Sequence, residues 1–265
     1  MTEAGARLDP SGIPGARRAP LPTEVSLQFP TLVAAAPAGD EWLHEVKYDG
    51  YRIVARLAGG EIRLITRHGK DWTARFPTIR AKLAALDAGD ALLDGEIVHE
   101  EPDGTTSFSA LARDLSEGRA EQLVYYIFDL LHLDGYSLLA ARLEDRKRVL
   151  AGWQPPGSAG PLRYSGHVEG NGPQFFARCC PRGFEGIVSK RRDAPYNPGH
   201  NKDWLKVKCV ARESSRLSAG PTRRAAARAS AHCYWAITTE REGFIMSAAS
   251  APASAAWYCA ICGGG

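Results

Sequence analysis

The stretch LVYYIFDLLHLDG, residues 123–135, is almost continuously apolar and is rich in residues that favour β-strands. A strand that is apolar on both faces is typical of the centre of a sheet that is covered on both sides. We therefore predict a central strand in this stretch. Asp129 places a charge on it, and because a buried unpaired charge is costly, this aspartate needs a partner or a function.

Alternating polarity and periodic apolar stripes divide the sequence around this strand into further strands and helices. In the last predicted strand, Lys206 and Lys208 occupy alternate positions, so both ammonium groups lie on one face. The predicted strands besides the central one are residues 42–47, 51–66 (two strands joined at a Gly-Gly turn), 91–98, 184–190 and this last one, 204–209. The predicted helices are residues 76–86, 143–153 and 172–180. This mixture, with several hairpins, indicates an α+β fold of antiparallel sheets flanked by helices.

The composition is that of a globular protein with a core, because 44% of the 265 residues are hydrophobic and the net charge is only +3. The Lys and Arg residues are clustered, which permits a local basic face. No run approaches the roughly 18 apolar residues of a membrane span, and the first residues lack the apolar core of a signal peptide. We therefore expect a cytoplasmic monomer with no membrane partner.

The six cysteines do not show the spacing of a zinc site. Cys179 and Cys180 are adjacent, and Cys259 and Cys262 form a late C-x-x-C, without a second pair or histidines at ligand spacing. For a cytoplasmic protein we expect ordinary reduced thiols.

The sequence predicts one folded domain between two irregular ends. Residues 1–20 are rich in Gly, Pro, Ala and Arg, show no periodicity, and predict a flexible lead-in. The periodic patterns fall within residues 21–210. Residues 211–265 form an irregular tail rich in Ala and Ser.

Cations and carboxylates recur at predicted strand ends or on sheet faces, where unpaired charge is costly. Lys47 ends the first predicted strand before an Asp-Gly turn, Glu96 and Glu185 accompany later strands, and Lys206 and Lys208 share a face. Each residue alone has an ordinary interpretation as a solvated strand end or face. Together they suit a polyphosphate bound with a divalent ion, because cations bind phosphates and carboxylates bind the metal. We therefore predict a nucleotide site.

Six short motifs occur in an order that resembles the nucleotidyltransferase motifs of ATP-dependent DNA ligases, especially the ligase domain of the bacterial end-joining enzyme ligase D. The resemblance covers roughly residues 20–210, and six motifs in order are far more specific than K-x-D-G alone. The motifs are KYDGYR (47–52), TRHGKDW (66–72), LLDGEIV (92–98), YYIFDLLHLDG (125–135), EGIVSKRRDAPY (185–196) and WLKVK (204–208). The resemblance implies the nucleotidyltransferase, or adenylation, domain of the DNA ligase and mRNA capping type.

The resemblance also implies a mechanism and roles for individual residues. Lys47 would attack the α-phosphate of ATP, release pyrophosphate and form a covalent lysyl-AMP; AMP would pass to a DNA 5′-phosphate, and the 3′-hydroxyl would seal the nick. Nearby cations and a bound Mg²⁺ would activate this lysine and neutralise the phosphoryl transition state. Phe128 would stack on the adenine, and Glu45 would contact the adenine.

The remaining implied contacts concern phosphate, sugar and metal. Lys206 and Lys208 would bind the α-phosphate. Glu96 and Glu185 would serve Mg²⁺ or Mn²⁺. The positions that match contacts to the nucleotide sugar, phosphate or DNA nick are Arg52, Arg67 and Glu96.

Nicked or broken double-stranded DNA is the implied substrate, in DNA repair, recombination or end joining at the nucleoid. A Ku-like end-binding protein and separate polymerase and nuclease modules are implied partners that would act in trans. Two alternatives stay open. An RNA ligase or capping guanylyltransferase shares the K-x-D-G chemistry, and a noncatalytic nucleic-acid-binding remnant would keep only the basic surface.

The sequence departs from the family after Val210, where family ligases continue into an OB-fold that closes over the site. Arg212, Arg216, Arg223, Arg224 and Arg228 could touch phosphates nonspecifically, although we expect a disordered tail. Residues 218–240 admit codons whose neighbouring frame resembles the start of an OB-fold domain, so we hypothesise a frameshift shortly after Val210. The nucleotide sequence that encodes these residues tests the frameshift hypothesis. Self-adenylation and nick sealing are expected to be impaired relative to a full ligase.

Overall fold

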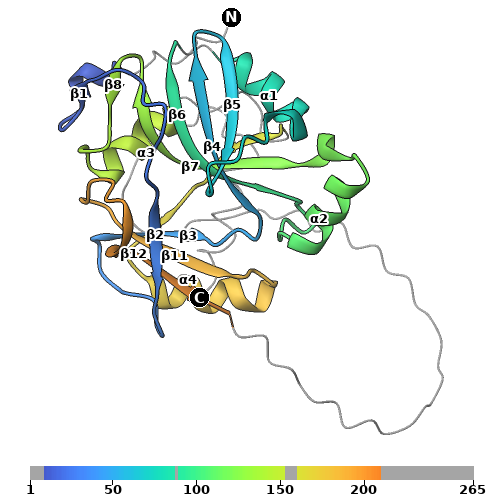
Figure 1. The fold of residues 1–265 in the computed structure, drawn as a ribbon. Helices are drawn as coiled ribbons and strands as arrows, with labels where there is room; N and C mark the ends of the chain where they lie inside the picture. Colours follow the sequence, from blue (N-terminus) through green and yellow to red (C-terminus); the bar gives the residue numbers. More distant parts are fainter. Residues whose placement is uncertain (1–8, 87–88, 153–159, 210–265) are drawn as a thin grey trace, which may run out of the picture.

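Two β-sheets with helices beside them form the fold in the computed structural model, which describes residues 9–86, 89–152 and 160–209 (Figure 1). The seven-stranded sheet has the order β1 (Arg17–Arg18), β8 (Tyr136–Ser137), β7 (Val124–Leu133), β6 (Ala91–Val98), β4 (Tyr51–Ala58) and β5 (Glu61–Thr66), with β9 (Leu162–Tyr164) also paired to β7. The five-stranded sheet has the order β10 (Val168–Glu169), β3 (Trp42–Val46), β11 (Gly186–Arg191), β12 (Gly199–Lys208) and β2 (Gln28–Leu32). Only the β7–β9 and β12–β2 pairs among these strands are parallel, so the predicted antiparallel α+β architecture is confirmed.

Four α-helices and four short 3₁₀ helices accompany the sheets in the described residues. The α-helices are α1 (Pro77–Ala84), α2 (Phe108–Ser116), α3 (Leu143–Gly152) and α4 (Gly172–Cys179). The 3₁₀ helices are η1 (Pro10–Gly12), η2 (Thr73–Arg75), η3 (Ala120–Gln122) and η4 (Cys180–Arg182). The three predicted helices are confirmed. α2 was not predicted; Ser107 caps it by accepting a hydrogen bond from the Ala110 N–H at 3.2 Å.

β7 is the central strand that the apolar stretch predicts, and all ten of its residues are buried. One face packs into the main core with α1 and α3, and the other face, which includes Phe128, packs against the segment around Leu27. The charge on this strand is explained by Arg146 of α3, whose Nε and second guanidinium nitrogen donate to the two Asp129 oxygens at 2.7 and 3.0 Å. Neither side chain has exposed surface, so this pair satisfies a charge that would otherwise be very costly to bury.

The Asp-Gly turn after Lys47 does not close a hairpin, because β3 belongs to the smaller sheet and β4 to the larger one. It carries the chain from one sheet to the other. Gly50 is needed where the turn passes β6, since a Cβ atom there would lie 2.2 Å from the Ile97 carbonyl oxygen. The Gly-Gly hairpin between β4 and β5 is as predicted, with Ala58 opposite Glu61.

The N-terminal segment differs from the expected flexible lead-in over residues 9–20. η1 begins at Pro10, and β1 pairs antiparallel with β8. Ile13 and Ala16 pack against the main core. Two apolar side chains and a short strand therefore hold a segment whose composition alone resembled a linker.

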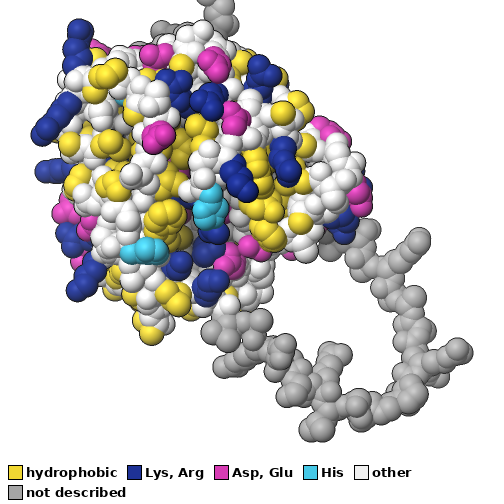
Figure 2. All heavy atoms as spheres, in the orientation of Figure 1, with side chains coloured by type: hydrophobic (Ala, Val, Ile, Leu, Met, Phe, Trp, Pro, Cys, Tyr) yellow, Lys and Arg dark blue, Asp and Glu magenta, His cyan; other side chains and the backbone are white. Residues whose placement is uncertain are grey.

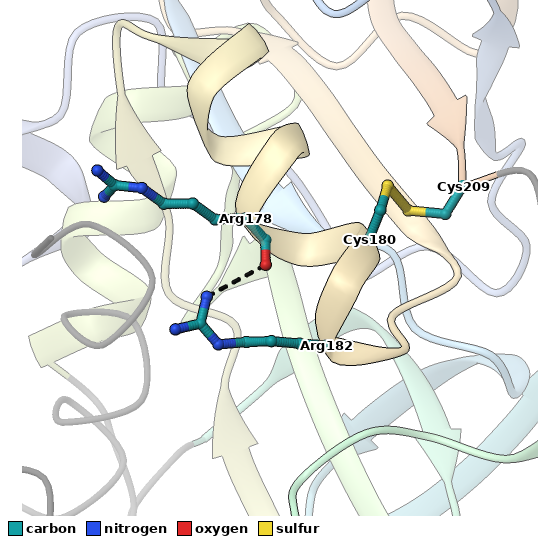
Figure 3. The surroundings of a disulfide bond; sticks show 4 residues. All are labelled: Arg178, Cys180, Arg182 and Cys209. Carbon is teal, nitrogen blue, oxygen red and sulfur yellow. Dashed lines mark hydrogen bonds between the residues drawn. A yellow bond between two sulfur atoms is a disulfide. The ribbon is translucent and has the colours of Figure 1, made fainter. Parts of the chain in front are cut away.

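The expectation of reduced thiols is wrong for Cys180 and Cys209, which form a disulfide across 29 residues. Figure 3 shows Cys180 at the start of the η4 turn, joined to Cys209 just beyond the end of β12. Spacing along the sequence could not reveal this pair, because the pairing of β11 with β12 brings the two cysteines together. Among the described residues, no helix is long and apolar enough to cross a membrane. The predicted tail and the frameshift hypothesis concern residues 211–265, which lie outside the described residues.

Candidate active site

A cavity of about 760 Å³ opens between the two sheets, which is an ordinary size for a small-molecule site. Strands of both sheets supply its walls. Seven of the nine predicted site residues line it: Glu45, Lys47, Arg52, Arg67, Glu96, Phe128 and Lys206. The other two, Glu185 and Lys208, form ion pairs beside it.

Lys47 directly follows β3, and its backbone N–H donates to the Gly186 carbonyl at 2.9 Å, which extends the pairing of β3 with β11. Its ammonium group contacts one oxygen of Glu185, and the other oxygen lies 3.2 Å from the Lys208 ammonium. The Lys47 side chain is 22% exposed, so it is accessible from the cavity without full solvation. One carboxylate shared by two ammonium groups thus holds the predicted nucleophile at the cavity wall.

β12 places Lys206 and Lys208 on one face, as their spacing predicts, but the two differ in exposure. Lys206 lines the cavity, whereas Lys208 is 55% exposed. Burial lowers the pKa of Lys206, and the charges of Lys47 and Lys208 lower it further. Since these three ammonium groups influence one another, an anion with several negative oxygens would relieve their mutual repulsion.

Glu96 lies on β6 opposite Arg52 of β4. Burial raises the pKa of Glu96 to about 7, and the negative charges of Asp94 and Glu185 add to this effect, while Lys47 and Arg52 oppose it. Within the described residues, no side chain donates a hydrogen bond to its carboxylate, and no cluster of three or more metal-binding side chains exists. The carboxylates of Glu96 and Glu185 fit an Mg²⁺ or Mn²⁺ ion that is bound together with a polyphosphate. Such ions take one or two carboxylates and complete their coordination shell with phosphate and water.

Arg52 is largely engaged in structural contacts. It forms two hydrogen bonds to Asp94, at 2.9 and 2.6 Å, and donates to the Gln28 carbonyl at 2.7 Å and to the Tyr196 hydroxyl at 3.2 Å. A guanidinium has five N–H donors, so little capacity is left for a ligand. Its implied contact with nucleotide or DNA stays a prediction, restricted to the remaining donor.

Glu45 lines the cavity, but its carboxylate is engaged by three side chains of the protein. It accepts from Lys147 at 2.7 Å, from Ser165 at 3.0 Å and from Lys190 at 3.0 and 3.1 Å. Burial raises the pKa of Glu45, but the charges of the two lysines outweigh it, so this pKa lies below its ordinary value. The implied contact between Glu45 and adenine stays a prediction. The contacts with the protein limit the free acceptor capacity of the Glu45 carboxylate.

Aromatic side chains form much of the cavity. Phe128 of β7 lies edge-on to Trp204 of β12, with ring centroids 6.0 Å apart. On another wall, the Tyr51 ring lies edge-on to Trp72 and to the partly exposed Phe108, with ring centroids 4.9 and 5.0 Å apart. Phe128 therefore lies in the cavity wall, and its implied stacking on adenine stays a prediction.

Two exposed cations lie in the turn after β5 beside the cavity. Arg67 lies at its rim and donates to His68 at 3.0 Å, and Lys70 lies nearby. Figure 2 shows Lys and Arg side chains interspersed with hydrophobic side chains on the face that includes the two sheets. Such a mixed surface suits a phosphate backbone.

The sequence interpretation missed several residues of this region, notably Lys147, Ser165 and Lys190. Lys190 lies in a predicted strand, two residues after Val188, and within one of the six motifs, and this position was a signal that could have identified it. Lys147 had no such signal, because on a predicted helix it resembled a solvated charge. Its burial follows only from the docking of α3.

Comparison with known families and curated proteins gives a consistent result. The family model described as "ATP dependent DNA ligase domain" matches residues 30–208. The chain is 36% identical over 196 residues to the multifunctional non-homologous end joining protein LigD of Pseudomonas aeruginosa, covering 74% of this chain and 23% of that protein. It is 37% identical over 169 residues to the LigD protein of Mycobacterium bovis, covering 63% of this chain and 22% of that protein. The chain thus spans about a quarter of the length of these curated relatives.

Solved structures agree. A mycobacterial DNA ligase D complexed with ATP and MES aligns with a TM-score of 0.59 and 34% identity, over 69% of this chain and 60% of that one. The ligase domain of Mycobacterium tuberculosis LigD aligns with a TM-score of 0.59 and 35% identity, over 69% of this chain and 59% of that one. The predicted nucleotidyltransferase fold is confirmed. The chain belongs to the ATP-dependent DNA ligase domain family.

Proposed function

We propose that this chain is the adenylation domain of an ATP-dependent DNA ligase of the LigD type and that Lys47 carries AMP. The observation that carries the proposal is the ion-paired triplet of Lys47, Glu185 and Lys208, with Lys206 in the adjoining cavity wall. A nucleophilic lysine needs a proton acceptor and a triphosphate needs cations, and this arrangement offers both.

In the first step, the Lys47 nitrogen forms a bond to the α-phosphorus of ATP, and the bond from that phosphorus to the pyrophosphate oxygen breaks. Glu185, which contacts the Lys47 ammonium group, would accept its proton in this step. Lys206 and Lys208 stabilise negative charge on the phosphate oxygens. In the second step, a DNA 5′-phosphate oxygen displaces Lys47 from AMP, and in the third a 3′-hydroxyl displaces AMP and seals the nick.

Glu96 and Glu185 would hold Mg²⁺ or Mn²⁺, and a bound cation would supply further positive charge to the phosphates. Phe128 orients the base by stacking. The basic rim around Arg67 binds the DNA backbone through its charge.

Nicked or broken double-stranded DNA is the proposed substrate, in the cytoplasm at the nucleoid. In end joining, a Ku-like protein and separate polymerase and nuclease modules would bring such ends to this domain.

Incubation with α-labelled ATP and Mg²⁺ tests the proposal, because label should become covalently attached to the wild-type chain. Lys47→Ala should abolish this label, whereas Lys82→Ala, which removes an exposed lysine of α1, should retain it. Label that persists in Lys47→Ala would remove Lys47 from its role. Label from GTP rather than ATP, or sealing of RNA rather than nicked DNA, would favour an RNA ligase or capping enzyme, and no label would favour a noncatalytic nucleic-acid-binding domain.

A further inference from the structure

A buried charge cluster behind the cavity contains two lysines and one carboxylate. Lys147 of α3 and Lys190 of β11 both bind Glu45, the residue that lies two positions before Lys47. The three side chains are at most 3% exposed. Ser165 donates the remaining hydrogen bond to Glu45, at 3.0 Å.

Lys190 is the member of this cluster that reaches both the cavity and its aromatic residues. Its ammonium group lies 4.4 Å from the centre of the Phe128 ring and 4.3 Å from that of Trp204, which are cation–π distances. It also bridges both Glu45 oxygens, at 3.0 and 3.1 Å. The position of Lys190 is therefore set by a carboxylate on one side and by two rings on the other.

Lys147 lies outside the six motifs and does not line this cavity. Its ammonium group donates to Glu45 at 2.7 Å and to the Ser165 carbonyl at 2.8 Å, and it lies 4.8 Å from the centre of the Tyr164 ring. It therefore binds the carboxylate from outside the cavity lining.

The charge balance of the cluster argues against a purely stabilising role. One lysine would neutralise Glu45, and a second buried cation adds a desolvation cost that its attraction to an already paired carboxylate offsets only in part. Asp129, another carboxylate whose charge acts on Lys190, is paired with Arg146. The second cation is explained if it shares Glu45 with Lys190. Lys190 is then not drawn fully into an ion pair, and its ammonium group stays against the two aromatic rings.

We propose that Lys147 is a positioning residue for the base end of the nucleotide site, where it holds Glu45 and thereby keeps the Lys190 ammonium group against Phe128 and Trp204. This inference rests on the proposed function, because it assigns the base end of the same site. Loss of Lys147 leaves Lys190 as the only cation on Glu45. Binding of the base is then weakened, while the phosphate-binding lysines at the other end of the cavity are unchanged.

Equilibrium binding measured by calorimetry tests this without requiring lysyl-AMP formation. The ligands are ATP, adenosine, which lacks the phosphates, and inorganic tripolyphosphate, which lacks the base. In Lys147→Met, the Kd values for ATP and adenosine should rise about tenfold, the loss typical of one hydrogen bond to a charged group, while the Kd for tripolyphosphate should not change. Lys147→Arg, which keeps the charge, should restore most of the affinity.

Arg192→Met is the matched control. Arg192 also links α3 to the end of β11, through Glu144 at 2.9 Å, but it does not line the cavity. This variant should lose some stability and keep all three Kd values. The inference is overturned if Lys147→Met binds ATP as the wild type does, if it weakens adenosine and tripolyphosphate equally, or if the wild type binds neither ATP nor adenosine. Normal binding without labelled protein would instead refute only the proposed function.

Discussion

Reduction of the Cys180–Cys209 disulfide is expected to lower the stability of the fold measurably. The bond closes a loop of 29 residues that contains β11 and β12. In the chain-entropy account, a closed loop of this length restricts the unfolded chain by about 12 cal/mol/K, which corresponds to about 3.5 kcal/mol at 25 °C. The folded loop is already held by the antiparallel β11–β12 pairing, so the effect should lie mainly in the unfolded state.

Urea denaturation followed by tryptophan fluorescence measures this effect, because Trp204 is buried on β12 inside the loop. With a denaturant slope of about 1–3 kcal/mol/M, the midpoint should fall by roughly 1.2–3.5 M urea when dithiothreitol is added. A variant with both Cys180→Ser and Cys209→Ser should unfold near the lower midpoint with or without reductant.

Two outcomes would refute the reasoning. One is an unchanged midpoint in reductant after thiol titration has confirmed that the bond is broken. The other is an equal effect of reductant on the double serine variant, since this would locate the sensitivity among the other four cysteines.

Two further predictions concern buried charge. Because the pKa of Glu96 is about 7 in the fold and near 4.5 ordinarily, the folded protein binds more protons than the unfolded one between these values, so the contribution of Glu96 to the free energy of unfolding falls as pH rises through this window. Glu96→Gln removes this fall. In urea denaturation, the free energy of unfolding of the wild type minus that of the variant should therefore be up to about 3 kcal/mol larger at pH 5 than at pH 8. An equal difference at both pH values contradicts the assignment. Arg146→Met leaves the buried Asp129 carboxylate without its cation and should lower the free energy of unfolding by about 3–5 kcal/mol in the same assay, whereas a loss below about 1 kcal/mol would mean that the pair contributes little.

Much of the site was predictable because its residues belong to short local patterns. The alternation around Lys206 predicted two ammonium groups on one face, and the pattern of the first predicted strand placed Lys47 at its end. Seven of the nine predicted residues line one cavity. Their roles toward ATP, metal and DNA stay predictions that the experiments above address.

Other features could not be predicted, because they depend on contacts between segments far apart in the chain. The Asp-Gly turn lies between two predicted strands, but the sequence does not show that these strands, β3 and β4, belong to different sheets, because pairing depends on the whole set of strands. Glu45 looked like a ligand for the base, yet its acceptors are engaged by side chains 102, 120 and 145 residues away.

The sequence by itself determined the central strand, the antiparallel α+β class and the family, because polarity patterns and motifs are local properties of the chain. Only the tertiary structure decided that Lys147 is buried against Glu45, that Cys180 meets Cys209, and that Arg52 binds Asp94. The physical reason is that burial and charge pairing are set by which surfaces pack together. A lysine on a helix has the same sequence signature whether its ammonium group faces water or a carboxylate.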